Sequence, residues 1–80
     1  MSHQVTVMTR QGCSGCVKAE QDVERICAEL GVEWTTADVD SDPEWRGEYG
    51  DRVPVILIDG DEHGYWSVEE DRFRKALADA

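Results

Sequence analysis

Two of the three cysteines lie close enough in the chain to do redox chemistry together. The segment Cys13-Ser14-Gly15-Cys16 separates the two thiols by three residues, which is about one helical turn. A pair with this spacing forms an internal disulfide, exchanges electrons with another disulfide, or supplies half of a metal site. Which of these chemistries is favoured depends on the elements that position the pair.

The cysteine pair lies where a predicted strand turns into a predicted helix. Residues 4–9 are few and rich in β-branched side chains, which predicts a strand. From residue 14 to residue 30, apolar residues recur every three or four positions, which predicts a helix that ends before Gly31. The pair therefore spans the start of a helix, where unpaired amide groups and the helix dipole stabilise a thiolate.

The position of each thiol predicts its role. Cys13 lies at or just before the first helical turn, next to solvent, and we expect it to be the nucleophile. Cys16 follows on the same side of the helix, so it can reach the sulfur of Cys13 and resolve a mixed disulfide. Arg10 precedes the pair and adds positive potential beside it.

Other functions of the same pair are less well supported. A structural zinc site needs four ligands, and the remaining candidates, Cys27, His3 and His63, form no second close pair. A structural disulfide across Cys13 and Cys16 would close so short a loop that it would stabilise little. Redox activity is therefore the favoured interpretation. A zinc or iron–sulfur carrier and an interaction module with an unused pair are the alternatives.

The third cysteine, Cys27, falls on the apolar side of the same helix with Val23, Ile26 and Leu30. A free cysteine in such a position behaves as a small apolar residue, so we expect it to be buried in the core. The alternative, a secondary redox-sensing thiol, requires solvent exposure that this pattern does not predict.

The rest of the chain predicts a single α/β domain over residues 1–80. The predicted elements are a strand at 32–39, a short helix started by Ser41-Asp42-Pro43-Glu44, a strand at 53–58, a hairpin turn at Asp59-Gly60, a strand at 62–66, and a last helix opened by a capping box at Ser67–Glu70. The order is β-α-β-α-β-β-α. We expect strands joined by helices to run parallel, and a four-stranded mixed sheet with helices on both faces.

Two further features have alternative interpretations. From the residues alone, Val53-Pro54 predicts a trans proline at the start of a strand. The aromatic residues Trp45, Tyr65 and Trp66 either line a substrate groove or pack half-buried against the sheet, and packing is the favoured interpretation.

The charge and the termini exclude several classes of function. The chain has 18 acidic and 8 basic residues and a net charge of -10, which argues against binding to nucleic acid or anionic membranes. No apolar run approaches the roughly 20 residues of a membrane span. Residues 1–4 show no secretory signal. We therefore expect a protein of the reducing cytoplasm, where a cysteine pair is more often redox-active or metal-binding than structural.

Taken together, the motifs resemble those of a glutaredoxin-like protein of the thioredoxin fold, and most closely the short bacterial glutaredoxin-like domains. The resemblance covers essentially the whole chain. It is carried by Cys13-Ser14-Gly15-Cys16, Asp38-Val39-Asp40, Val53-Pro54, the Asp59-Gly60 hairpin and the order of the elements.

The resemblance implies further properties of the site. Pro54 would be a cis-proline that faces the cysteine pair, and the main chain of Val53 would pair with the substrate as an added strand. Arg10 would bind a carboxylate of glutathione. The implied activity is reduction of protein or mixed disulfides. This reaction requires no bound cofactor, and nothing in the sequence demands a dimer, so we expect a monomer without a resident cofactor. Glutathione, another small thiol or a reductase would supply the electrons.

Overall fold

The elements of the structure follow the predicted order. The computed structural model describes residues 3–78, so Met1 and Ser2, part of the N-terminal segment considered above, lie outside the described residues. The elements are β1 (Gln4–Thr9), α1 (Ser14–Leu30), β2 (Glu33–Asp38), the 3-10 turn η1 (Val39–Ser41), α2 (Pro43–Tyr49), β3 (Val55–Ile58), β4 (Asp61–Tyr65) and α3 (Glu70–Ala78). Within residues 3–78, no helix combines the length and apolar character needed to cross a bilayer.

The four strands form one mixed sheet in the order β2-β1-β3-β4. β1 and β2 are parallel, whereas β3 runs antiparallel to both β1 and β4. The prediction that all strands joined by helices are parallel is therefore wrong at β3. The reason is the length of α2, whose seven residues span only about 10 Å. This helix is too short to carry the chain back along β2, so β3 starts near the edge at which β2 ends.

Helix α1 has the predicted bounds, and its ends show why. Cys13 has an extended backbone and caps the first turn, while Gly31 ends the helix in the left-handed conformation at φ 68°. The predicted apolar side of the helix is buried as far as Cys27, and it includes Ala19, Val23 and Ile26. Leu30, predicted to lie on the same side, is 43% exposed at the end of the helix. The periodicity therefore determines both the length of the helix and the side that it turns to the sheet.

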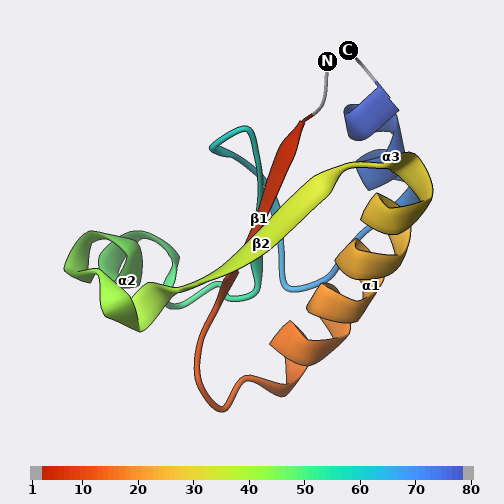
Figure 1. Ribbon diagram of the computed structural model, residues 1–80. Helices are drawn as coiled ribbons and strands as arrows, with labels where there is room; N and C mark the ends of the chain where they lie inside the picture. Colours follow the sequence, from red (N-terminus) through yellow and green to blue (C-terminus); the bar gives the residue numbers. More distant parts are fainter. Residues whose placement is uncertain (1–2, 79–80) are drawn as a thin grey trace.

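The helices cover both faces of the sheet, as predicted (Figure 1). On one face, α1 and α3 pack over β1 and β3, and the buried residues there are Val5, Val7, Val23, Ile26, Cys27, Ile56, Phe73 and Leu77. On the other face, Tyr49 of α2 packs against a smaller cluster, Met8, Val39, Val55 and Leu57. The sheet thus holds α1, with the cysteine pair at its start, against a well-packed core.

The hairpin between β3 and β4 uses the predicted turn. Asp59 and Gly60 have φ angles of 54° and 87°, and a two-residue turn with positive φ at both positions matches the twist of the flanking strands. The Asp59 carboxylate also accepts a hydrogen bond from the Gln4 main-chain N–H at 2.8 Å. Its pKa is lowered mainly by the hydrogen bond with His3.

The predicted capping box of the last helix is wrong, because α3 begins at Glu70 and not after Ser67. The chain first makes a tight turn, in which Trp66 has φ 71° and the Ser67 N–H donates to the carbonyl oxygen of Tyr65 at 2.9 Å. Val68 then packs against the larger core cluster. This turn delays the helix and leaves Trp66 at the surface.

Candidate functional site

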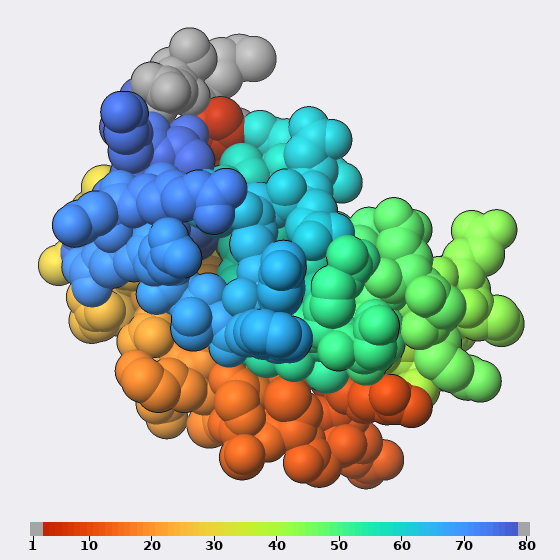
Figure 2. Space-filling model, turned by 180° about the vertical axis from the view of Figure 1, so that it is seen from behind, coloured from red at the N-terminus to blue at the C-terminus, as the bar shows by residue number. Residues whose placement is uncertain are grey.

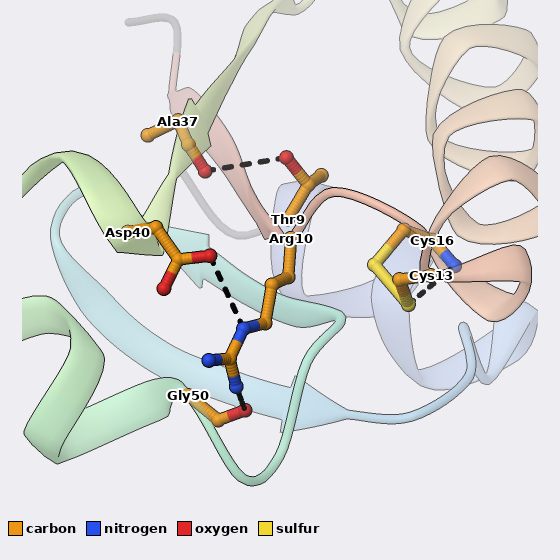
Figure 3. Close-up of a disulfide and its surroundings, with 7 residues drawn as sticks. All are labelled: Thr9, Arg10, Cys13, Cys16, Ala37, Asp40 and Gly50. Carbon is orange, nitrogen blue, oxygen red and sulfur yellow. Dashed lines mark hydrogen bonds and ion pairs between the residues drawn. A yellow bond between two sulfur atoms is a disulfide. The ribbon is translucent and has the colours of Figure 1, made fainter.

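The structure brings the two predicted catalytic cysteines together at the start of α1. Cys13 is the half-buried N-cap residue, and Cys16 is the third helical residue with 2% of its surface exposed. They are joined by a disulfide, and their Cα atoms are 5.3 Å apart (Figure 3). Cys13 is therefore the sulfur that a partner molecule reaches first.

The surroundings of Cys13 favour a negative charge on its sulfur. The Cys16 main-chain N–H donates to Cys13 Sγ at 3.2 Å. The first turn of α1 contains no acidic residue. The unpaired amides and the dipole at a helix N-terminus stabilise an anion, so they favour the thiolate of the reduced pair. The arrangement suits Cys13 as a nucleophile and as a leaving group.

Val53-Pro54 lies against the cysteine turn, and its peptide bond is cis. The cis-proline implied by the resemblance is confirmed, and the trans bond expected from the residues alone is wrong. A β-carbon added at Gly15 would lie 3.8 Å from Pro54 Cδ, so the proline ring faces the first turn of α1. The carbonyl oxygen of Pro54 accepts the main-chain N–H of Trp66 at 2.7 Å. Pairing of the Val53 main chain with a substrate stays a prediction.

Arg10 borders the site, but its side chain is held within the protein. Its Nε donates to Asp40 Oδ2 at 3.2 Å and one terminal nitrogen donates to the carbonyl oxygen of Gly50 at 3.3 Å (Figure 3). Its own carbonyl accepts the N–H of Cys13 at 3.2 Å. Arg10 therefore ties the cysteine turn to the loop after α2. Binding of a substrate carboxylate by Arg10 stays a prediction.

A hollow of about 540 Å³ lies beside the pair, and we call it the cysteine hollow. It is bordered by Thr9, Arg10, Gln11, Gly12, Cys13, Ser14, Cys16, Val17, Glu20 and Asp38. Thr9 borders it, and the Thr9 hydroxyl donates to the Ala37 carbonyl oxygen at 3.4 Å. The hollow gives a disulfide-bearing chain access to Cys13.

The remaining candidate residues lie elsewhere. Cys27 is completely buried, as predicted, and desolvation raises the pKa of its thiol, which disfavours reaction. In the described part of the chain, no three histidine, cysteine, aspartate or glutamate side chains gather so as to hold a metal ion. His63 packs on Phe73 with the ring centroids 5.9 Å apart, and burial lowers its pKa.

The expectation that the aromatic residues pack half-buried is wrong for Tyr65 and Trp66, which are 45% and 64% exposed. Trp45 is exposed as well, with 37% of its surface accessible, so the expectation is wrong for this residue too. Sequence reasoning missed the exposure of Trp66 because the predicted strand included this residue. In the structure the strand ends at Tyr65, and the positive φ of Trp66 turns it away from the sheet. No signal in the residues alone predicts that turn.

Comparison with protein families and known sequences places this geometry in context. Residues 4–78 match the family described as glutaredoxin-like domain (DUF836). The uncharacterized protein Rv0508 of Mycobacterium tuberculosis is 44% identical over 80 residues, covering 94% of this chain and 82% of that protein. The uncharacterized protein Mb0520 of Mycobacterium bovis matches to the same extent.

Solved structures show the same fold. Protein Ne2328 of Nitrosomonas europaea superposes with a TM-score of 0.85 at 20% identity, covering 96% of this chain and 93% of that one. Glutaredoxin 1 of Francisella tularensis, solved with cacodylate, has a TM-score of 0.64 at 26% identity, covering 96% and 99%. Thioredoxin of Fasciola hepatica has a TM-score of 0.62 at 26% identity, covering 96% and 79%. The predicted thioredoxin-like architecture is confirmed.

Proposed function

The chain belongs to the glutaredoxin-like domain family, and from this premise we propose that it is a dithiol thiol–disulfide oxidoreductase that reduces protein or mixed disulfides. One observation carries the proposal. Cys13 caps α1 at the surface, and Cys16 lies one turn behind it within disulfide-bonding distance. A nucleophile and a resolving thiol are thus held in one rigid turn.

The first step is attack on the substrate. The Cys13 thiolate attacks one sulfur of the substrate disulfide, a bond forms between the two sulfurs, and the substrate S–S bond breaks. The second substrate sulfur leaves as a thiolate and takes a proton from solvent. The amide of Cys16 and the start of α1 stabilise the attacking anion.

The second step releases the product. Cys16 loses its proton, attacks the sulfur of Cys13 and displaces the substrate sulfur as a thiolate. The result is two substrate thiols and a Cys13–Cys16 disulfide, so two electrons have moved to the substrate. A reductant must then return two electrons. Two molecules of glutathione or another small thiol, or the dithiol of a reductase, supply them.

Two neighbouring residues would position the substrate. Because Pro54 faces the first turn of α1, a substrate strand would add to the main chain of the adjoining Val53. We further propose that the protein works as a monomer in the reducing cytoplasm, with no resident cofactor.

The test is reduction of 2-hydroxyethyl disulfide, an uncharged substrate, by the pre-reduced protein, followed by turnover with glutathione or with a thioredoxin-reductase system as donor. We expect reduction by the wild type, none by Cys13→Ser, and an accumulated mixed disulfide in Cys16→Ser. Failure of the pre-reduced wild type to reduce this substrate would overturn the proposal. Zinc retained through desalting, or absorption above about 400 nm, would instead indicate a metal or iron–sulfur carrier.

A further inference from the structure

An exposed pair of aromatic residues lies beside the cis-proline. The rings of Tyr65 and Trp66 meet edge to face, with centroids 5.0 Å apart. Trp66 adopts a backbone φ of 71°, which bulky residues rarely do, and such strain is found mainly at functional positions. Its N–H is bound to the carbonyl oxygen of Pro54. A large ring is therefore held at the surface, next to the element that faces the cysteine pair.

Trp66 forms a wall shared by two hollows, which we call the aromatic hollows. One, of about 220 Å³, is also bordered by Gly15 and Ala19 of α1. The other, of about 370 Å³, is bordered by Glu69 and Arg72. Figure 2 shows the light-blue segment after β4 next to the orange start of α1. A polypeptide that presents a disulfide to the cysteine hollow and crosses the first turn of α1 at Gly15 reaches the hollow that Trp66 borders.

The charges around the three hollows favour a cationic partner. Three bordering carboxylates, Glu20, Asp38 and Glu69, make no ion pair within residues 3–78. Two bordering cations are neutralised, because Arg10 pairs with Asp40 and Lys18 pairs with Asp22. Arg72 is the one bordering cation that has no such partner in the described chain. This local excess of negative charge has the same sign as the net charge of -10.

We propose that Trp66 determines substrate specificity, and that the preferred substrates are polypeptide disulfides flanked by lysine or arginine. A cationic side chain stacks on the exposed indole, where the ring face attracts it. The unpaired carboxylates and the field of the whole domain draw a basic segment in and repel an acidic one. This inference rests on the proposed function of the cysteine pair and names the substrate class of that site.

The test is single-turnover reduction by the pre-reduced protein, so no external donor is needed. Two synthetic peptides carry the same disulfide, flanked by lysines in one and by glutamates in the other. The rate constant for each peptide is divided by the rate constant for reduction of the same peptide by dithiothreitol. This ratio corrects for the intrinsic reactivity of each disulfide. At low ionic strength we expect the basic peptide to react at least about tenfold faster than the acidic one, and the ratio to shrink in 0.5 M salt.

The role of the indole is tested by Trp66→Gly. Glycine adopts φ 71° without strain and keeps the N–H that binds Pro54, so the fold is retained. We expect the rate with the basic peptide to fall about three- to thirtyfold. Trp45→Ala is the matched control, because Trp45 is also surface-exposed but borders none of the three hollows. We expect this control to react like the wild type.

The role of charge is tested by two neutralising variants. Glu69→Gln should lower the ratio of basic to acidic peptide rates, whereas Arg72→Gln should raise it, and a merely structural role would not give opposite signs. Equal rates for the two peptides would overturn the inference, and so would a ratio of basic to acidic peptide rates that Trp66→Gly leaves unchanged. In either case, reduction of 2-hydroxyethyl disulfide would still support the proposed function. Loss of reduction with all three substrates would overturn the proposed function itself.

Discussion

The hydrogen bond from the Cys16 main-chain N–H to Cys13 Sγ provides a direct way to perturb the nucleophile. Cys16→Ala removes the second sulfur and keeps this N–H, whereas Cys16→Pro removes both. The donor and acceptor are 3.2 Å apart. Proline is tolerated in the first helical turn, and Gly15 before it has no β-carbon to clash with the ring. The same N–H also donates to the carbonyl oxygen of Cys13 at 3.2 Å. The two variants therefore differ in the contacts of one N–H, and only its hydrogen bond to Sγ bears directly on the charge of the Cys13 sulfur.

The size of the effect follows from the energy of a hydrogen bond to a charged group. Such a bond contributes about 1.5–3 kcal/mol, and about 1.36 kcal/mol corresponds to one pKa unit. We therefore expect the pKa of Cys13 to be about one to two units higher in Cys16→Pro than in Cys16→Ala. The helix dipole remains in both variants and does not contribute to the difference.

The assay is thiolate absorbance at 240 nm, followed during a pH titration of each reduced variant. Far-UV circular dichroism and protection of the buried Cys27 thiol report whether α1 stays folded. Equal pKa values in two variants with the same helix content would refute the role assigned to the amide.

Three other predictions concern the framework of the site. Gly50→Ala should destabilise the fold by about 1–3 kcal/mol in urea denaturation, because its β-carbon would overlap the carbonyl oxygen of Arg46; unchanged stability would contradict this. Glu70 has a pKa lowered from 4.5 to about 2, mainly by its hydrogen bond with Arg25, so its stabilising effect is present above pH 4.5 and is lost as the pH falls toward 2. Glu70→Gln should therefore be less stable than the wild type at pH 7 and equally stable near pH 2, and a pH-independent difference would argue against the ion pair. The reduced native protein should release two equivalents of thionitrobenzoate from Ellman's reagent, one when Cys13 reacts and one when Cys16 displaces the mixed disulfide. In guanidinium it should release three, because Cys27 is completely buried in the native state; three from the native protein would contradict that burial.

The features that could be predicted from the sequence are those set by local chemistry. The apolar periodicity and Gly31 determine the bounds of α1, and Asp59-Gly60 determines the turn between β3 and β4. Each of these features depends on side chains that are close together in the sequence. The same applies to the cysteine pair. The strand before the pair and the helix after it can each be predicted from nearby residues. The position of the pair at the start of α1 could therefore be predicted as well.

The features that could not be predicted depend on contacts between distant segments. The direction of β3 depends on how far α2 carries the chain, and the start of α3 depends on the turn at Trp66. The cis bond before Pro54 followed from the family resemblance and not from the two residues themselves. The side-chain partners of Arg10 come from Asp40 and the Gly50 loop, which only the fold brings near.

The central claim is that Cys13 is the ionised, accessible thiol of the pair. The most direct measurement is the rate of iodoacetamide alkylation of each cysteine in the reduced protein as a function of pH, mapped by peptide mass spectrometry. We expect Cys13 to be labelled first, with a midpoint well below the value of about 8.5 for a free thiol, while Cys16 and Cys27 react slowly. Equal labelling of Cys13 and Cys16, or a midpoint for Cys13 at or above about 8.5, would contradict the claim.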